Sequence, residues 1–177
     1  MASSTPDDAR TALIDVLEVL ALADAADVRL WIDGGWGVDA LLGRQSRDHG
    51  DLDVAVEARH LEPLVEILRA SGFTKVDEKG ATAWNFLMAR PHGPVVDLHV
   101  IVLDADGNGI LGPPDAGNSY PAAALTGRGT LGGRVVDCIT AEWAVRFHDA
   151  YPGDAKDRAD VQALCERFGL AVPQQYQ

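Results

Sequence analysis

Two neighbouring glycines followed by an alternating pair of aspartates restrict the fold of this chain more than any other feature. Gly34 and Gly35 lie between an apolar run, Val28–Ile32, that predicts a short strand, and a helical pattern over Trp36–Leu42. Glycines at such a junction let the backbone approach a phosphate closely, and the N-terminus of the following helix favours anions. A glycine pair alone is common in turns. A pair about sixteen residues before Asp51-Leu52-Asp53 is much stronger evidence for a phosphate-binding turn.

Three aspartates predict a metal site on two strands. Asp51 and Asp53 belong to a predicted strand around Leu52–Val56, where alternate residues project from one face, so both carboxylates point to the same place. They repel each other unless a cation lies between them, and oxygen ligands suit Mg²⁺. Asp97 lies within the apolar run Val95–Leu103, where a buried charge needs a partner such as that metal. The three could hold two Mg²⁺ for phosphoryl or nucleotidyl transfer, with Asp97 accepting a proton.

The remaining pattern predicts an α+β fold with a short mixed sheet flanked by helices. We expect a helix from Thr11, another over Leu61–Ala70, a hairpin and a last strand, then a small C-terminal helical unit. The predicted division is 1–139 for the main domain and 140–177 for the helical unit. The segment 104–134 is rich in glycine and proline and resists assignment. Further expectations are hairpin strands over Ala83–Ala89 and Val95–Leu103, a strand over Val135–Ile139, helix caps at Thr140 and Asp154, and a buried face with Val161, Leu164, Cys165 and Phe168.

Composition excludes several classes of protein. The chain has 177 residues and a net charge of −12, which argues against binding DNA or RNA mainly through charge. No apolar run reaches the roughly 18 residues of a membrane span. The first eight residues lack the basic and apolar regions of a signal peptide, so we expect a cytoplasmic protein. Two distant cysteines, Cys138 and Cys165, predict buried thiols rather than disulfides or zinc ligands.

Several motifs together resemble the small antibiotic nucleotidyltransferases of the polymerase-β-type superfamily. The similarity spans roughly residues 28–168, and the glycine and carboxylate pattern is specific to the superfamily. Within it the chain is most similar to the lincosamide nucleotidyltransferases, and the aminoglycoside 2″-nucleotidyltransferases share a looser version. The motifs are Trp31-Ile-Asp-Gly-Gly-Trp-Gly-Val-Asp39, Leu42-Gly-Arg44, Arg47-x-His49-x-Asp51-x-Asp53, Val96-Asp-Leu-His99, Gly117-Asn-Ser-Tyr120, Phe147-His-Asp-Ala-Tyr-Pro152 and Lys156-Asp157-x-x-Asp160.

This resemblance implies a nucleotidyltransferase fold and a Mg²⁺-dependent reaction, with two metal ions. A nucleoside triphosphate, ATP above others, would give its nucleoside monophosphate to a hydroxyl of a lincosamide and release pyrophosphate. Gly34 and Gly35 would lie against the triphosphate. Asp51, Asp53 and Asp97 would bind the metal, with Asp97 as the general base. Gly35 replaces the hydroxyl residue that many superfamily members carry there, so a side-chain contact to phosphate is lost and a backbone contact remains.

Other residues are candidates for binding the two substrates. Arg44, Arg47 and Lys156 are candidates for the triphosphate, because negative charge builds on the leaving pyrophosphate, although each could be a solvated surface charge. His49 and His99 each lie two residues from a predicted metal ligand, so both are candidates to line the cleft. The candidates for contacting the acceptor are His99, Trp84, Asn118 and Tyr120; for Trp84 a core position is an equal alternative.

Three alternatives remain open. The acceptor could be an aminoglycoside, although such a polycation needs acidic side chains and the segment 104–134 offers only Asp104, Asp106 and Asp115. The chain could be a non-antibiotic or antitoxin-like member of the same fold, and a homodimer is left open. A 2-His-1-carboxylate iron site built on His49, Asp51 and either His99 or His148 would not need the glycine pair.

Overall fold

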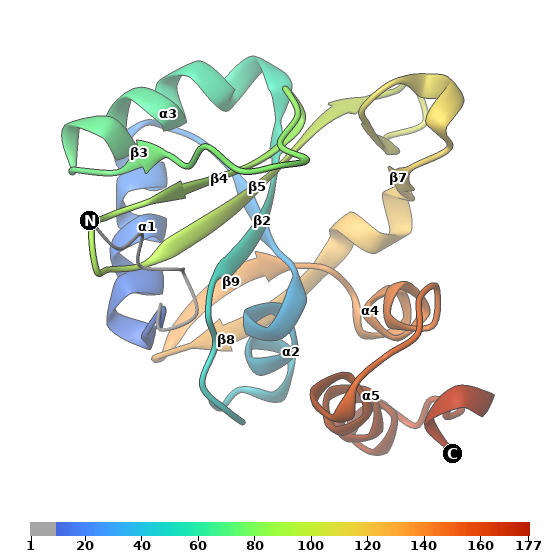
Figure 1. Ribbon diagram of the computed structural model, residues 1–177. Coiled ribbons are helices and arrows are strands. Elements are labelled where there is room, and N and C mark those ends of the chain that lie inside the picture. Colours follow the sequence, from blue (N-terminus) through green and yellow to red (C-terminus); the bar gives the residue numbers. More distant parts are fainter. Residues whose placement is uncertain (1–9) are drawn as a thin grey trace.

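A mixed sheet of nine strands forms the centre of the computed structural model, which describes residues 10–177 (Figure 1). The main path of the sheet runs β3-β4-β5-β2-β1-β9-β8, and β6 pairs with β5 and β7. The expectation about the N-terminal eight residues lies outside the described part. The strands are β1 Leu30–Ile32, β2 Leu52–Glu57, β3 Thr74–Lys75, β4 Asn85–Ala89, β5 Val95–Leu103, β6 Gly109–Leu111, β7 Ser119–Tyr120, β8 Gly127–Leu131 and β9 Arg134–Cys138.

Five α-helices of the described residues cover the two faces of this sheet (Figure 1). Helices α1 and α3 contact each other on one face, whereas α2, α4 and α5 contact one another on the other. None of these helices is long and apolar enough to span a membrane. Their bounds are α1 Leu13–Ala25, α2 Gly34–Leu42, α3 Leu61–Ala70, α4 Ala141–His148 and α5 Ala155–Phe168.

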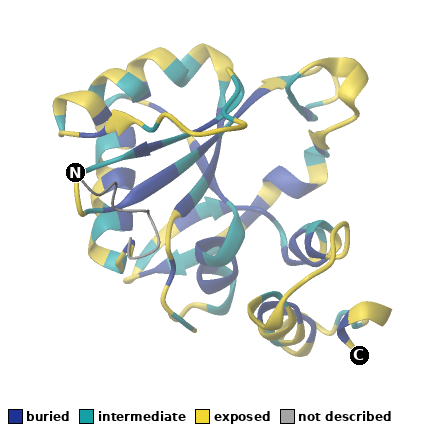
Figure 2. Cartoon of the chain, viewed as in Figure 1, coloured by how far each residue is buried: buried dark blue, intermediate teal, exposed yellow. Residues whose placement is uncertain are grey.

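Alternation along the strands separates two hydrophobic cores. Buried residues gather along the central strands and on the helix faces turned toward them (Figure 2). In β2, Val54 and Val56 belong to the core beneath α1 and α3, whereas Ala55 belongs to the core beneath α4 and α5. Because side chains two residues apart share a face, Asp53 lies on the same side as Ala55. In β5, Asp97 likewise shares its face with Ile101 of the second core. The carboxylates therefore face the layer that holds the C-terminal helices.

Most predicted elements form where the pattern placed them. The helix over Leu61–Ala70 and the β4–β5 hairpin are confirmed, and Asp154 caps α5 through the backbone N–H groups of Lys156 and Asp157. Phe168 is 41% exposed, so its predicted place on the buried face is wrong: it is the last residue of α5, beyond the contact with the core. Cys138 and Cys165 are buried free thiols.

The unassigned segment 104–134 is structured rather than an open loop. It forms β6, β7 and β8, with 3₁₀ turns at Pro114–Ala116 and Ala122–Thr126. These strands are two to five residues long, too short for alternation to reveal them. Their effect is to carry Tyr120 back to the sheet, where β7 pairs with β6 beside β5.

Candidate active site

The start of α2 positions the glycine pair. The helix begins at Gly34, not at Trp36 as the pattern predicted, because Asp33 caps it: the backbone N–H of Gly34 donates to Asp33 Oδ1 (2.8 Å). Gly34 has φ +54°, a conformation that strongly favours glycine. A Cβ on Gly34 would overlap the carboxylate of Asp53. The glycine therefore lets the first turn of α2 lie directly against that carboxylate.

Strand pairing brings two of the three predicted metal ligands side by side. β2 and β5 are parallel, and Asp53 is the register partner of Asp97. Ligand atoms of Asp53, Asp97 and His99 all lie within 4.8 Å of one another, a spacing that one cation could bridge. Asp51 immediately precedes β2 and is the more exposed carboxylate; it is not part of that group of three.

The electrostatics of this group favour a cation. Burial, followed by the negative charges of Asp51 and Asp33, raises the pKa of Asp53 to about 7. Burial and the charge of Asp97 also raise the pKa of Asp51. Such shifts mean that ionised carboxylates repel one another here, and a divalent cation would relieve that repulsion. The oxygen-rich donor set fits Mg²⁺.

A hydrogen-bond network that sequence reasoning missed surrounds Asp97. The amide of Asn85 donates to Asp97 Oδ1 (2.6 Å), and His99 Nε2 lies 3.5 Å from Asp97 Oδ2. His99 Nδ1 lies 2.6 Å from the hydroxyl oxygen of Tyr120, which in turn donates to Asp33 Oδ2 (2.8 Å). Burial opposes protonation of His99, but its hydrogen bond to Asp97 and the charge of Asp97 raise its pKa overall.

Of the three predicted triphosphate-binding cations, Arg47 lies nearest the glycine pair. A Cβ on Gly35 would come within 2.6 Å of Arg47 Nη2, so the guanidinium packs over the first turn of α2. The same nitrogen donates to Asp160 of α5 (2.8 Å). Lys156 precedes Asp160 by one helical turn on the same side of α5, and its Nζ is exposed, 3.7 Å from Asp154. Arg44 lies apart from these groups, in a hollow lined by α5 residues that include Glu166.

His49 lies beneath the glycine turn rather than lining the surface of the cleft as expected. It is 4% exposed, its Nε2 lies 2.5 Å from the buried carboxylate of Asp39, and its ring packs on Trp36 and against Gly35, where an added Cβ would overlap it. The strand begins only at Leu52, so alternation does not extend back to His49. His148 is also buried, with Nδ1 2.7 Å from the carbonyl of Ala144. The described residues therefore do not assemble the iron site considered above.

The predicted acceptor-binding residues are in different environments. His99 lies in the carboxylate group, and Tyr120 is buried with its hydroxyl engaged by Asp33 and His99. Trp84 is half-buried against the first core, with its indole next to Gly112. Asn118 is exposed, and its backbone carbonyl accepts a hydrogen bond from the backbone N–H of Leu111 (2.9 Å). Only His99 and Tyr120 of these four contact the carboxylate network.

Sequence reasoning missed the roles of Asn85 and Asp33. Asn85 is the register partner of His99 across the β4–β5 hairpin, so the predicted hairpin contained the signal once its register was known. Asp33 does cap α2, but its second oxygen joins the network through Tyr120. Both contacts depend on residues far apart in the chain.

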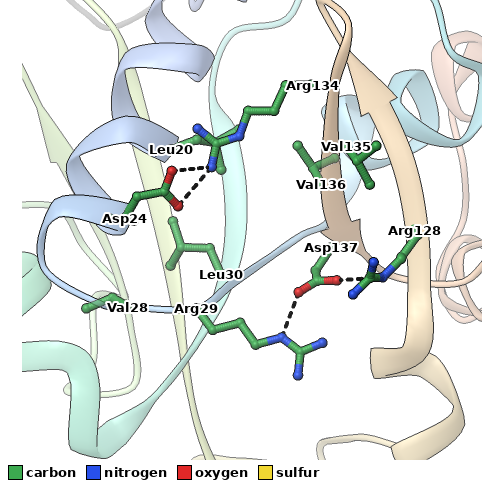
Figure 3. Close-up of a pocket in the computed structure, with 11 residues that line it drawn as sticks. Leu20, Asp24, Val28, Arg29, Leu30, Arg128, Arg134, Val135, Val136 and Asp137 are labelled. Carbon is green, nitrogen blue, oxygen red and sulfur yellow. Dashed lines mark hydrogen bonds and ion pairs between the residues drawn. The ribbon is translucent and has the colours of Figure 1, made fainter.

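A separate hollow of about 330 Å³ lies at the other end of β1, between α1 and the β8–β9 hairpin (Figure 3). Its charged side chains are all paired: Asp137 with Arg29 (2.7 Å) and Arg128 (3.4 Å), and Asp24 with Arg134 (2.8 Å). Three arginines thus face two aspartates in this hollow, and each charged side chain has a partner of opposite charge.

Solved structures with the same architecture establish the class of protein. The lincosamide antibiotic adenylyltransferase LnuA, with lincomycin bound, superposes with a TM-score of 0.75 and 27% identity, over 88% of this chain and 97% of that one. ANT(2″)-Ia in complex with adenylyl-2″-tobramycin shares the fold at a TM-score of 0.71 and 23% identity, over 89% of each chain. The mixed sheet, its flanking helices and the carboxylate group define a nucleotidyltransferase, which confirms the predicted fold.

Sequence comparison identifies the family. A family model described as aminoglycoside-2″-adenylyltransferase matches residues 15–164, and the chain belongs to this family. A lincosamide resistance protein of Staphylococcus haemolyticus is 29% identical over 150 residues, covering 85% of this chain and 92% of the relative. A 2″-aminoglycoside nucleotidyltransferase of Escherichia coli is 40% identical over 63 residues, about a third of either chain (34% and 36%). The resemblance inferred from the motifs is confirmed.

Replacing Gly34 by alanine is expected to reduce kcat/KM for nucleotidyl transfer about 100-fold, as displacements near 1 Å do in active sites. The added Cβ overlaps the Asp53 carboxylate and pushes it away from Asp97. Gly43→Ala is the matched control, since Gly43 also has a positive φ (+71°) but no atom within 4 Å of its Cβ position. Steady-state kinetics and thermal melts of both variants distinguish the effect of backbone strain at a positive φ from the effect of displacing the Asp53 carboxylate. Equal losses in the two variants would contradict the role of the Gly34–Asp53 contact.

Proposed function

We propose that this chain transfers AMP from ATP to a hydroxyl of a lincosamide antibiotic and releases pyrophosphate. The observation that carries the proposal is the pairing of Asp53 with Asp97 beside the glycine start of α2, in a chain whose fold and sequence follow LnuA over most of their length. The lincosamide relatives cover almost the whole chain, whereas the aminoglycoside enzymes match over about a third of it in sequence.

The triphosphate is proposed to bind at the start of α2. Backbone N–H groups and the positive end of the helix dipole at Gly34 and Gly35 attract phosphate oxygens. The guanidinium of Arg47 lies over the same turn, and Lys156 lies on the adjacent part of α5, where both would stabilise the charge of the leaving pyrophosphate. Arg44, which lies in a separate hollow, is retained as a weaker candidate for contact with the nucleotide.

Asp51, Asp53 and Asp97 are the proposed ligands of Mg²⁺. When bound, Mg²⁺ supplies charge stabilisation to the phosphoryl oxygens and lowers the repulsion among these carboxylates. Asp97 takes the proton of the acceptor hydroxyl, whose oxygen forms a bond to the α-phosphorus while the bond to the bridging oxygen of pyrophosphate breaks. The amide of Asn85 occupies Asp97 Oδ1 and leaves Oδ2 on the side of His99 for that proton.

The proposed contacts to the acceptor are His99, Trp84 and Asn118, while the buried Tyr120 holds His99 through a hydrogen bond. Helices α4 and α5 pack on the same face of the sheet as His99. An aminoglycoside is the second candidate, because the family model bears that name. A lincosamide is the first candidate, because the lincosamide resistance protein matches 85% of this chain and 92% of its own length.

A drug panel tests the proposal directly. The protein is incubated with ATP and Mg²⁺ and with lincomycin, clindamycin, tobramycin or kanamycin, and products are read by mass spectrometry. We expect an added AMP on the lincosamides and none without Mg²⁺. AMP addition to the aminoglycosides alone would move the acceptor to the second candidate. A chain that modifies neither class would rule out the antibiotic function, and pyrophosphate release with GTP, CTP or UTP would show a different donor.

A further inference from the structure

We propose that Tyr120 is a positioning residue that acts on the reaction through His99, rather than a contact to the acceptor. This inference rests on the proposed nucleotidyl transfer and deepens it. Tyr120 is 6% exposed, and its ring packs edge-on against Phe147, with ring centroids 5.5 Å apart. Its hydroxyl lies between two groups of the site, Asp33 Oδ2 at 2.8 Å and His99 Nδ1 at 2.6 Å.

Hydrogen-bond chemistry determines where the protons of this network lie. An ionised carboxylate can only accept, so the hydroxyl proton of Tyr120 is donated to Asp33. The Tyr120 oxygen must then accept from His99, and Nδ1 of His99 therefore carries a proton. Burial and the charge of Asp33 raise the pKa of Tyr120 well above its ordinary value, so the hydroxyl stays protonated.

The consequence concerns the other ring nitrogen of His99. With Nδ1 held by Tyr120, Nε2 of the His99 ring is turned toward Asp97 Oδ2, 3.5 Å away. Without the hydroxyl, the ring could rotate or carry its proton on Nε2 instead. Tyr120 thus sets the orientation and tautomer of His99, as partners of this kind do for catalytic and metal-binding histidines.

The same network ties the two halves of the site together. Asp33 accepts from Tyr120 with one oxygen and caps α2 at Gly34 with the other. The position of Asp97 is therefore linked to the first turn of α2 through His99, Tyr120 and Asp33. Since its single donor is already used by Asp33, the hydroxyl has no proton left to give an incoming acceptor.

Kinetics of Tyr120→Phe separate positioning from acceptor binding. The ring and its packing remain, so we expect kcat to fall about 10- to 100-fold, the usual effect of removing such a supporting hydrogen bond, while KM for lincomycin changes less than about twofold. An increased KM with unchanged kcat would overturn the proposal and make Tyr120 an acceptor contact. Tyr176→Phe is the control, because it also removes a buried tyrosine hydroxyl, one that donates to the backbone carbonyl of His148 (2.7 Å) outside the carboxylate network; we expect kcat to stay near that of the unaltered protein.

A spectroscopic measurement tests the proposal without any acceptor. Two-bond ¹⁵N–¹H correlation spectra of the histidine rings, recorded at increasing pH until the His99 signals stop changing, distinguish the two tautomers of the neutral ring. We expect His99 to carry its proton on Nδ1 in the unaltered protein, and a shift toward Nε2 in Tyr120→Phe but not in Tyr176→Phe. An Nε2 proton in the unaltered protein would overturn the proposal. This result holds or fails independently of whether the drug panel yields a product.

Discussion

Replacing Asp97 by asparagine is expected to nearly abolish nucleotidyl transfer, with kcat reduced about 10²- to 10⁴-fold as for the loss of a general base. Asparagine has nearly the same shape and can still accept the hydrogen bond from Asn85, so the strand pairing is preserved. It cannot take the proton of the attacking hydroxyl, and it is a weaker ligand for Mg²⁺. Binding of ATP should be largely retained, because the glycine turn and Arg47 are unchanged. Calorimetric titration with a non-hydrolysable ATP analogue and single-turnover kinetics measure the two effects separately.

Asp137→Asn is the matched control for this experiment. Asp137 and Asp97 have side chains of equal exposure, 21%, and both lie on strands of the same sheet, but Asp137 pairs with Arg29 at the far hollow. We expect its kcat to remain near that of the unaltered protein. Retained turnover in Asp97→Asn would show that Asp97 is not the general base, and His99 would become the next candidate for that role.

Replacing Asp53 by asparagine is expected to stabilise the metal-free protein at pH 8 while removing its activity. The pKa of Asp53 in the folded chain, about 7, lies above the ordinary value of 3.8. The folded state therefore binds more protons than the unfolded state between these values, and stability is lost as the pH rises through about 7. At pH 8 the ionised carboxylate destabilises the fold by about 2 to 4 kcal/mol, which asparagine avoids.

Chemical denaturation in EDTA and in Mg²⁺ measures this trade-off. In EDTA the unaltered protein should lose stability from pH 5 to pH 8, whereas Asp53→Asn should change little over that interval. Added Mg²⁺ should stabilise the unaltered protein at pH 8 and have a much smaller effect on the variant, because a ligand that binds only the folded state stabilises it. A variant less stable than the unaltered protein in EDTA at pH 8 would contradict the proposed repulsion among Asp51, Asp53 and Asp33.

The local part of the site was predictable from sequence, and the part that depends on tertiary contacts was not. The glycine pair and Asp51-x-Asp53 lie within one strand–helix–strand segment, so their chemistry is visible in the residue pattern. Asp97 stood out because a charge interrupts an apolar strand. Asn85, by contrast, is an ordinary polar residue at the start of a strand, and only the register of the hairpin places its amide on Asp97.

Predictions from residue spacing were wrong where they assumed a strand or helix beyond its actual ends. His49 shares the parity of Asp51 and Asp53, but it precedes the strand and turns inward to Asp39. Arg44 and Arg47 are three residues apart in one loop, yet Arg47 packs on the glycine turn, whereas Arg44 lines a separate hollow. No periodic rule applies within a loop, so sequence alone could not distinguish them.

The second hydrophobic core has a consequence for how the chain folds. Its members come from both parts of the predicted division: Trp31, Val38 and Ala55 before residue 139, and Val145 and Leu164 after it. The two C-terminal helices thus complete a core that the earlier strands begin. The ion pair between Arg47 and Asp160 also joins the loop after α2 to α5. A fragment ending at residue 139 would leave this face uncovered. We therefore expect the described chain to unfold in a single cooperative transition, so that the catalytic sheet and its helical cover are gained and lost together.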